Sequence, residues 1–343
     1  MKKLLLISGL VISGLVISAV AGAQEQCGFP VSLARSGFES GEQPASVVLP
    51  PENTPVTVTI LGPANASTVG VGAIQVFGTF TGPANTGISV NGVPALTDGE
   101  SFVSPRVLLE PGVNTLTIRY ATTDAAPVEI TRSITYTASA TPAVLFAAGS
   151  PGDYTPTVVP FTLATKFPSA QNVITNVQVD YDGNGTFEVN GAQPTKLEYA
   201  YERAGLYVAT AIVTFDDGNT GTPPVIVQDQ TRVLAQSLAF TRQTLCGVYY
   251  TMKNRLVQNQ IALAVNTQSP KQQARMTTLW NALANAGRLN AVATKLGPIV
   301  DGQIARNTAE MMFAIATTTA GEFDGFQVRF RKDVNGVWRI DAM

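Results

Sequence analysis

Histidine is absent from the 343 residues of the chain. Because histidine is the commonest general base and metal ligand near neutral pH, its absence excludes Ser-His-Asp and Cys-His catalysis, histidine-based zinc sites and histidine phosphotransfer. What remains is carboxylate, lysine or tyrosine chemistry. The sequence therefore predicts a protein that is not an enzyme and that carries no organic cofactor.

Cysteine is nearly absent, with Cys27 and Cys246 as the only two. In an oxidising compartment an even pair of cysteines is more often bridged than free. A Cys27–Cys246 disulfide would tie the N-terminal part of the chain to the start of the last domain and would enclose the modules between them. Two free thiols are the alternative, because sequence alone does not supply the Cα separation that a bridge requires.

Charge is also scarce, at 13% of residues with a net charge of −2, which argues against nucleic acid or an acidic membrane surface as the main partner. Residues 24–242 hold 9 Lys and Arg against 18 Asp and Glu, whereas residues 243–343 hold 11 against 6. This asymmetry could mark a face for an anionic partner, or the two parts could attract each other. We favour the second interpretation.

The N-terminus has the three parts of a secretory signal peptide. Met1-Lys2-Lys3 is followed by an uncharged run to Val20 and by Ala21-Gly22-Ala23. An uncleaved membrane anchor is the alternative, because the run is nearly long enough to span a bilayer. We expect cleavage after Ala23, export to the periplasm, the cell surface or the medium of a bacterium, and no transmembrane span in the mature chain.

Residues 24–54 follow the predicted signal peptide and lack the period of a helix or a long strand. They are rich in Gly, Ser and Glu and end near Pro50-Pro51. The composition predicts an extended leader or linker.

Residues 55–138 show short alternating apolar runs separated by turn residues, which predicts an antiparallel β-sandwich. Asn91-Gly92 between two such runs predicts a tight hairpin. With these features, the segments Val56-Thr57-Val58, Val90-Asn91-Gly92-Val93 and Glu110-Pro111-Gly112-Val113-Asn114 resemble the bacterial immunoglobulin-like module of glucodextranase and many surface proteins.

Residues 144–235 predict a second sandwich. An acidic glycine turn, Asp180-Tyr181-Asp182-Gly183-Asn184-Gly185, precedes Tyr201, Gly205 and Tyr207 and a long alternating strand. This order resembles the polycystic-kidney-disease type of β-sandwich. The tryptophan common before the turn in that family is replaced here by Val179 or Tyr181.

Residues 243–343 change to a helical period and then return to strands. Val248, Met252 and Leu256 fall on one helical face, and Ser269-Pro270 predicts the start of a second helix that holds Met276, Trp280 and Leu289. Helices followed by a sheet ending in Gly336-Val337-Trp338-Arg339-Ile340 resemble the nuclear transport factor two-like superfamily of α+β cones. The fold class is therefore mostly β and multidomain, with two antiparallel sandwiches before a small α+β cone-like domain.

Asp180, Asp182 and Asn184 match the first half of a calcium loop, in which alternating oxygen donors wrap a hard cation. The twelfth position of such a loop should be Glu and is Gly191. The alternative, which we favour, is an acidic turn whose side chains cap their own backbone.

Two side-chain groups in the last domain could carry function. A set of aromatic residues could line a pocket or form the core, and the carboxylates beside them could supply a base as in the isomerases of that superfamily. The aromatic residues are Tyr249, Tyr250, Trp280, Phe313, Phe323, Phe326, Phe330 and Trp338, and the carboxylates are Asp301, Glu310, Glu322, Asp324, Asp333 and Asp341. We favour packing or binding over catalysis. Arg329, Arg331, Lys332 and Arg339 predict a solvent-exposed basic face of the sheet.

These patterns favour an exported adhesion, scaffold or binding protein of the cell envelope, without catalytic activity, whose partner is an envelope or extracellular protein or a polysaccharide. The alternative is a carbohydrate-binding accessory protein or a small-molecule-binding, even enzymatic, cone-domain protein. A homodimer through the C-terminal domain is a further hypothesis.

Overall fold

The computed structural model describes residues 3–5, 52–138, 143–166, 173–192, 194–216, 221–319 and 322–343. The chain forms two compact units. The described residues of Pro50–Leu238 with Val334–Val337 make the sandwich unit, and those of Ala239–Asp333 with Trp338–Met343 and residues 3–5 make the α+β unit. The predicted signal peptide and leader lie outside the described residues, apart from residues 3–5 and 52–54, and so does Cys27.

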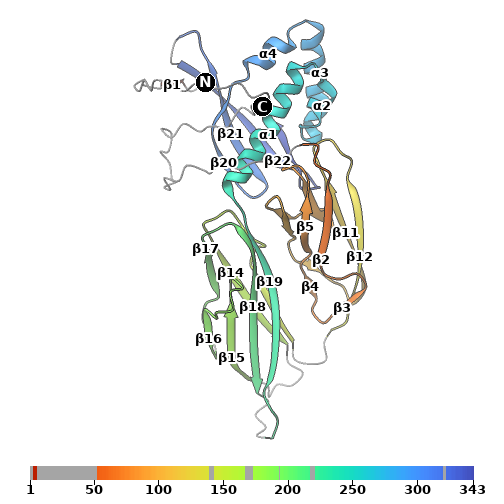
Figure 1. The fold of residues 1–343 in the computed structure, drawn as a ribbon, viewed down its shortest axis with the longest axis vertical. Helices are drawn as coiled ribbons and strands as arrows, with labels where there is room; N and C mark the ends of the chain where they lie inside the picture. Colours follow the sequence, from red (N-terminus) through yellow and green to blue (C-terminus); the bar gives the residue numbers. More distant parts are fainter. Residues whose placement is uncertain are drawn as a thin grey trace. The chain divides into compact units, whose positions relative to one another are not determined.

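The first sandwich, drawn in orange to yellow in Figure 1, consists of two sheets in the orders β2-β5-β9-β8 and β3-β12-β11-β6-β7, and β4 pairs with β10 in a separate two-stranded ladder. All pairs are antiparallel except β3 with β12, which run parallel. Its strands are β2 (Thr57–Gly62), β3 (Ser67–Val69), β4 (Ala73–Ile74), β5 (Phe77–Thr81), β6 (Gly87–Val90), β7 (Val93–Pro94), β8 (Leu96–Thr97), β9 (Ser101–Val103), β10 (Val107–Leu108), β11 (Gly112–Ala121) and β12 (Val128–Tyr136).

The predicted hairpin at Asn91-Gly92 is confirmed. Val90 pairs with Val93, and Asn91 and Gly92 have φ angles of 50° and 77°. Two successive residues with positive φ match the right-handed twist of the flanking strands, which is why Asn-Gly suits this position. The hairpin packs on a core built from inward-facing residues of both sheets, among them Ile88, Phe102 and Ile118.

The second sandwich consists of a three-stranded sheet, β13-β14-β17, and a four-stranded sheet, β16-β15-β18-β19, all antiparallel. Its strands are β13 (Ala143–Ala148), β14 (Thr157–Lys166), β15 (Val173–Asp180), β16 (Val189–Gly191), β17 (Glu198–Tyr201), β18 (Gly205–Asp216) and β19 (Val225–Ala235). On β18, Ala209, Ala211, Val213 and Phe215 are buried at every second residue, as a sheet with one face on the core requires.

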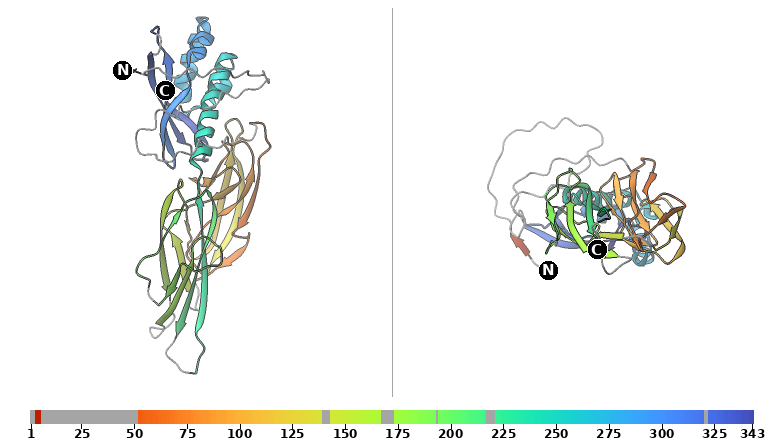
Figure 2. Two further views of the ribbon diagram at one scale, coloured as in Figure 1. Left: turned by 60° about the vertical axis from the view of Figure 1, so that its left-hand side comes forward. Right: turned by 90° about the horizontal axis from the view of Figure 1, so that it is seen from below.

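The α+β unit packs helices on one face of an antiparallel sheet in the order β22-β21-β20, with β23 paired to β22 (Figure 2). Its elements are α1 (Leu238–Val257), α2 (Ile261–Val265), α3 (Pro270–Asn285), α4 (Leu289–Lys295), β20 (Ile299–Ile304), β21 (Thr308–Ala316), β22 (Glu322–Lys332) and β23 (Trp338–Ala342). A short strand, β1 (Lys3–Leu5), also pairs antiparallel with the first residues of β22. Among the described residues, none of the helices is both long and apolar enough to cross a membrane.

Two details of this unit differ from the prediction. Leu289 was placed in the same helix as Met276 and Trp280, but α3 ends at Asn285 and α4 begins at Leu289. Gly287 between them has a φ of 67°, which interrupts the helix. Strand β20 was not predicted, because its sequence contains Gly302 and a bulge and therefore alternates poorly.

The fold class is as predicted. Strands hold 49% of the chain and helices 18%, which makes the protein mostly β, with two sandwiches followed by an α+β part.

Candidate metal-binding loop

The acidic loop joins β15 to β16 at one end of the second sandwich. It begins at Asp180, the last residue of β15, and ends at Glu188, just before β16. Gly183 and Gly185 have φ angles of 76° and 86°, a left-handed conformation that favours glycine. These two glycines let the chain turn tightly around the carboxylate of Asp180.

Asp180 is the anchor of this turn. Its side chain is buried, and its two carboxylate oxygens accept the backbone N–H groups of Gly183 at 2.7 Å and Gly185 at 2.8 Å. A carboxylate that accepts two backbone N–H groups in this way stabilises a turn without any cation.

The other predicted ligands are also engaged in the loop. Asp182 accepts the backbone N–H of Asn184 at 3.1 Å on one oxygen, and the Asn184 amide at 3.0 Å and the Tyr199 hydroxyl at 3.2 Å on the other. The Asn184 side-chain oxygen accepts the N–H of Thr186 at 2.6 Å. The structure thus brings all three predicted residues into one hydrogen-bonded loop.

Glu188 joins the group, although the sequence analysis did not single it out. Ligand atoms of Asp180, Asp182 and Glu188 lie within 4.8 Å of one another. Glu188 also accepts the backbone N–H of Tyr181 at 2.8 Å. Glu188 is the ninth residue counted from Asp180. In helical calcium loops the residue at position nine often binds calcium through a water molecule. Comparing position nine of the sequence with such a loop, as well as position twelve, would therefore have found Glu188.

A ladder of aromatic rings lies beside the loop and crosses the core of the sandwich. Successive ring centroids are 4.7 to 5.3 Å apart, within the range of favourable aromatic pairs. The rings are, in order, Phe146, Phe161, Tyr181, Tyr199, Tyr201 and Tyr207.

Tyr201 and Tyr207, which we call the tyrosine corner, form two unequal hydrogen bonds. The buried Tyr201 hydroxyl donates to the Tyr181 carbonyl at 2.9 Å, whereas the Tyr207 hydroxyl donates to the Arg203 carbonyl at an exposed site, also at 2.9 Å. The first bond ties β17 to the acidic loop, and the second closes the short turn between β17 and β18.

Burial and the acidic loop raise the pKa values of three rings of this ladder. Burial raises the pKa of Tyr181 to about 12, with the Glu188 charge acting in the same direction. Burial also raises the pKa of Tyr199, and the charge of Asp182 adds to this shift. Burial raises the pKa of Tyr201 as well, and there the neighbouring Tyr199 adds to the shift. These phenols stay protonated at neutral pH, and the hydroxyls of Tyr199 and Tyr201 act as hydrogen-bond donors rather than bases.

The second predicted site, a pocket in the last domain, has most of its lining residues in the core instead. Tyr249, Tyr250, Trp280, Phe313, Phe330 and Trp338 belong to the hydrophobic core between helices and sheet. Phe326 is exposed at 42%, and its ring stacks on Phe313. The aromatic residues therefore hold the unit together.

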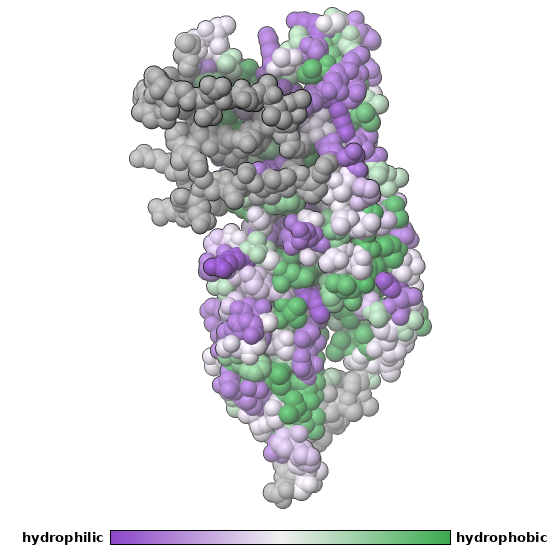
Figure 3. Space-filling model, viewed as in Figure 1, coloured by the Kyte–Doolittle hydropathy of each residue, from purple (hydrophilic) through white to green (hydrophobic). Residues whose placement is uncertain are grey.

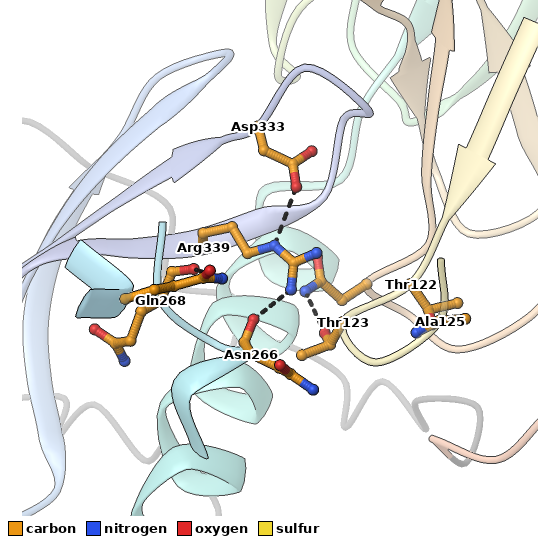
Figure 4. A network of polar contacts seen from close by, with 9 residues as sticks. Thr122, Thr123, Ala125, Asn266, Gln268, Asp333 and Arg339 are labelled. Carbon is orange, nitrogen blue, oxygen red and sulfur yellow. Dashed lines mark hydrogen bonds and ion pairs between the residues drawn. The ribbon is translucent and has the colours of Figure 1, made fainter. Parts of the chain in front are cut away.

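The buried carboxylate of Asp341 and the nearly buried one of Asp333 are paired with basic side chains. The Asp341 carboxylate lies 2.7 Å from the Lys271 Nζ. The Asp333 carboxylate lies 3.1 Å from the Arg339 Nε, and the Arg339 guanidinium also donates to the backbone oxygen of Asn266 (Figure 4). Burial raises the pKa of Asp341, but the hydrogen bonds that its carboxylate accepts and the charges of Lys271 and Arg331 together outweigh burial and leave the pKa below its ordinary value. An ionised, paired carboxylate is a poor general base or acid near neutral pH.

The predicted solvent-exposed basic face is wrong for two of its four residues. Arg329 and Arg331 are exposed, but Lys332 is buried and the Arg339 side chain is 12% exposed in its ion pair. Val328, Phe330 and Lys332 point to the same side of β22 because side chains alternate along a strand. Lys332 therefore follows two core residues into the interior.

No protein-family model matches the chain, and comparison with curated proteins gives no match. Among solved structures, the chain is similar to fibronectin(III)-like modules of CbhA from Clostridium thermocellum (15% identity, 53% of this chain and 95% of that chain, TM-score 0.20). It is also similar to domains 5-6 of the S-layer protein SbsC (13% identity, 53% and 99%, TM-score 0.23) and to the Ig1-2 module of the Drosophila receptor protein tyrosine phosphatase DLAR (11% identity, 53% and 98%, TM-score 0.22). Scores this low carry no argument about function. By their own sheets and cores, the two modules are β-sandwiches.

Proposed function

We propose that this protein is an exported bacterial binding or scaffold protein that acts without catalysis. One observation carries the proposal: most of the aromatic side chains that could line a catalytic pocket in the α+β unit fill its core, and the nearly buried Asp333 and the buried Asp341 are paired with Arg339 and Lys271. Residues so engaged hold structure rather than move protons.

The finer family assignments are part of this proposal. The Asn91-Gly92 hairpin supports a glucodextranase-type immunoglobulin-like module, and the Tyr201 hydrogen bond beside the acidic turn supports a polycystic-kidney-disease-type module. Helices followed by a sheet ending at Trp338–Ala342 support a nuclear transport factor two-like domain. Modules of these kinds commonly space and present recognition surfaces.

Exposed apolar side chains on the first sandwich are the recognition residues that we propose. Leu108 and Val113, at the two ends of the β10–β11 connection, are exposed at 83% and 73%. Hydrophobic residues gather in separate patches over the sandwiches in Figure 3. Apolar residues beside a loop on a rigid sheet are suited to contact a partner protein.

Carbohydrate binding is the second candidate, and it calls for a row of exposed aromatic rings on one sandwich face. Among the described residues of the two sandwiches, Phe187 is the one aromatic side chain classed as exposed, at 36%. A single ring does not make a platform for a sugar chain. We therefore favour a protein partner.

The test is capture of envelope components by the immobilised mature protein, with a Leu108→Ser/Val113→Ser variant beside a Val158→Ser control, whose side chain is 59% exposed. We expect one defined protein to be retained by the unaltered chain and the control and lost from the double variant. Retention of a polysaccharide would favour the second candidate. Consumption of a substrate that stops on changing one acidic residue, such as Glu310→Gln, would overturn the proposal.

A further inference from the structure

Among the strands that the structure describes, β19 has a strand partner on one of its two edges only. The sheet order is β16-β15-β18-β19, so β19 pairs with β18 on one side only. Unpaired N–H and C=O groups along such an edge need hydrogen-bond partners where they are buried. The partners come from the first sandwich and from the loop that precedes β14.

Gln75 of the first sandwich pairs with this edge as a strand residue would. Its side-chain amide nitrogen donates to the Arg232 carbonyl at 3.1 Å, and its side-chain oxygen accepts the Arg232 N–H at 2.8 Å. The same oxygen accepts the hydroxyl of the fully buried Thr231 at 3.0 Å. One side chain thus satisfies both backbone groups of Arg232.

An apolar contact lies next to this hydrogen-bonded pair. Leu96 and Val103 from the first sandwich and Leu234 from β19 are buried to 2% exposure or less and form one cluster, against which Phe77 packs. The guanidinium of Arg232 lies 3.6 Å from the centroid of the Phe77 ring. A cation held over an aromatic face inside a partly desolvated interface adds attraction to the burial of apolar area.

Polar contacts continue to both ends of the buried part of β19. At one end, Arg106 donates to the Ala73 carbonyl at 3.2 Å and to the Phe146 carbonyl, while Asp229 accepts the Phe146 N–H at 2.7 Å and faces Arg106. At the other end, the side-chain amide of Gln236 donates to the Thr97 carbonyl at 2.7 Å. Contacts from position 229 to position 236 extend over about 23 Å of strand.

We propose that the two sandwiches move as one rigid body, held by the side-chain pairing of Gln75 with the edge of β19. Sandwich modules joined in series are expected to move relative to each other unless their interface is large and well packed. Here the interface combines edge hydrogen bonds, an apolar cluster and partly buried charged groups over the length of a strand. This inference concerns the coupling of the modules and holds whatever ligand the protein binds.

The experiment compares the full mature chain with Gln75→Ala and with Gln228→Ala, a control on an exposed position of β19. A fluorophore pair at the exposed positions Thr115 and Ala200, introduced as unnatural amino acids, measures the distance distribution between the sandwiches. Hydrogen exchange of the peptide over residues 229–236 measures the edge pairing. Gln75→Glu, which keeps the acceptor and loses the donor, serves if the alanine variant fails to fold.

We expect a narrow distance distribution for the unaltered chain and the control. For Gln75→Ala we expect a broader distribution and roughly tenfold faster exchange of the Arg232 N–H, which Gln75 accepts in the unaltered chain. A broad distribution in the unaltered chain would overturn the rigid coupling. A narrow distribution that Gln75→Ala leaves unchanged would show that Gln75 does not hold it.

Discussion

Lys332 is a buried amine with an aromatic neighbour and a like charge nearby. Its nitrogen lies 5.3 Å from the centroid of the Trp338 ring, and burial, helped by the charge of Arg306, lowers its pKa from 10.5 to about 8. Because the unfolded chain binds this proton more tightly, the lysine destabilises the fold at all pH values below 8. That cost is relieved as the pH rises from 8 to 10.5.

We therefore predict that Lys332→Met stabilises the α+β unit at pH 7. The pKa shift corresponds to about 3 kcal/mol, from which about 1 kcal/mol of lost cation–π attraction is subtracted. Urea unfolding followed by tryptophan fluorescence measures this unit alone, because Trp280 and Trp338 are the only tryptophans. Stability should rise between pH 8 and 10 in the unaltered chain and stay level in the variant; the same rise in both would contradict the assignment.

For the Arg339–Asp333 pair we predict the opposite effect: replacing the basic residue by methionine lowers the unfolding free energy. Both side chains are nearly buried, at 12% and 10% exposure, so removing the arginine leaves an uncompensated carboxylate in the interior. We expect Arg339→Met to cost about 3 kcal/mol of unfolding free energy. Arg331→Met is the matched control, because Arg331 is 60% exposed and 3.7 Å from Asp341, and we expect a cost below about 1 kcal/mol. Equal losses in the two variants would refute the distinction.

At the scale of elements, the two tyrosines of the tyrosine corner allow the stabilising effect of a buried hydrogen bond to be compared with that of an exposed one. Tyr201→Phe removes the donor to the buried Tyr181 carbonyl, and we expect a loss of about 1.5 kcal/mol. Tyr207→Phe removes a bond of the same length at an exposed site, where water replaces it, and we expect a loss below about 0.5 kcal/mol. Denaturant unfolding followed by far-UV circular dichroism measures both; a larger loss for Tyr207→Phe would reverse the assignment.

Melting temperatures measured with and without Ca²⁺ test whether the acidic loop is a calcium site or a turn capped by its own side chains. Because Asp180, Asp182 and Asn184 already accept N–H groups from the loop itself, we expect millimolar Ca²⁺ and EDTA to give the same melting temperature for the sandwich unit. Mg²⁺ is the control for ionic strength. A rise in melting temperature that is specific to Ca²⁺ and disappears in Asp182→Asn would establish a metal site here.

Sequence patterns predicted those elements whose structure is decided locally. The Asn91-Gly92 turn and the alternation along β18 are set by backbone preference and by a single buried face. Strand β20 and the pairing of Gln75 with β19 depend on neighbours far along the chain, which no local period reports. Lys332 could have been placed inside by continuing the alternation of Val328 and Phe330, but its charge was given more weight than its position.

At the scale of the whole molecule, the predicted signal peptide affects the structure directly. Residues 3–5 form β1 on the edge of β22, so cleavage after Ala23 would remove that strand and leave residues 322–324 unpaired on that side. Export and cleavage would also place Cys27 near the new N-terminus in an oxidising compartment. Cys246 is 4% exposed in α1, within the core of the α+β unit.

If Cys27 and Cys246 are bridged in the exported protein, removing either sulfur breaks the same bond. We therefore predict that Cys27→Ala and Cys246→Ala each lower the stability of the α+β unit, by about 2 to 4 kcal/mol, and that reduction of the unaltered chain has the same effect. Tryptophan fluorescence during denaturant unfolding measures all three, and peptide mapping without reductant should show a chain beginning at Gln24 with the two cysteines linked. Two free thiols would predict another result: Cys27→Ala would leave stability unchanged, while Cys246→Ala would still cost the packing of a buried side chain.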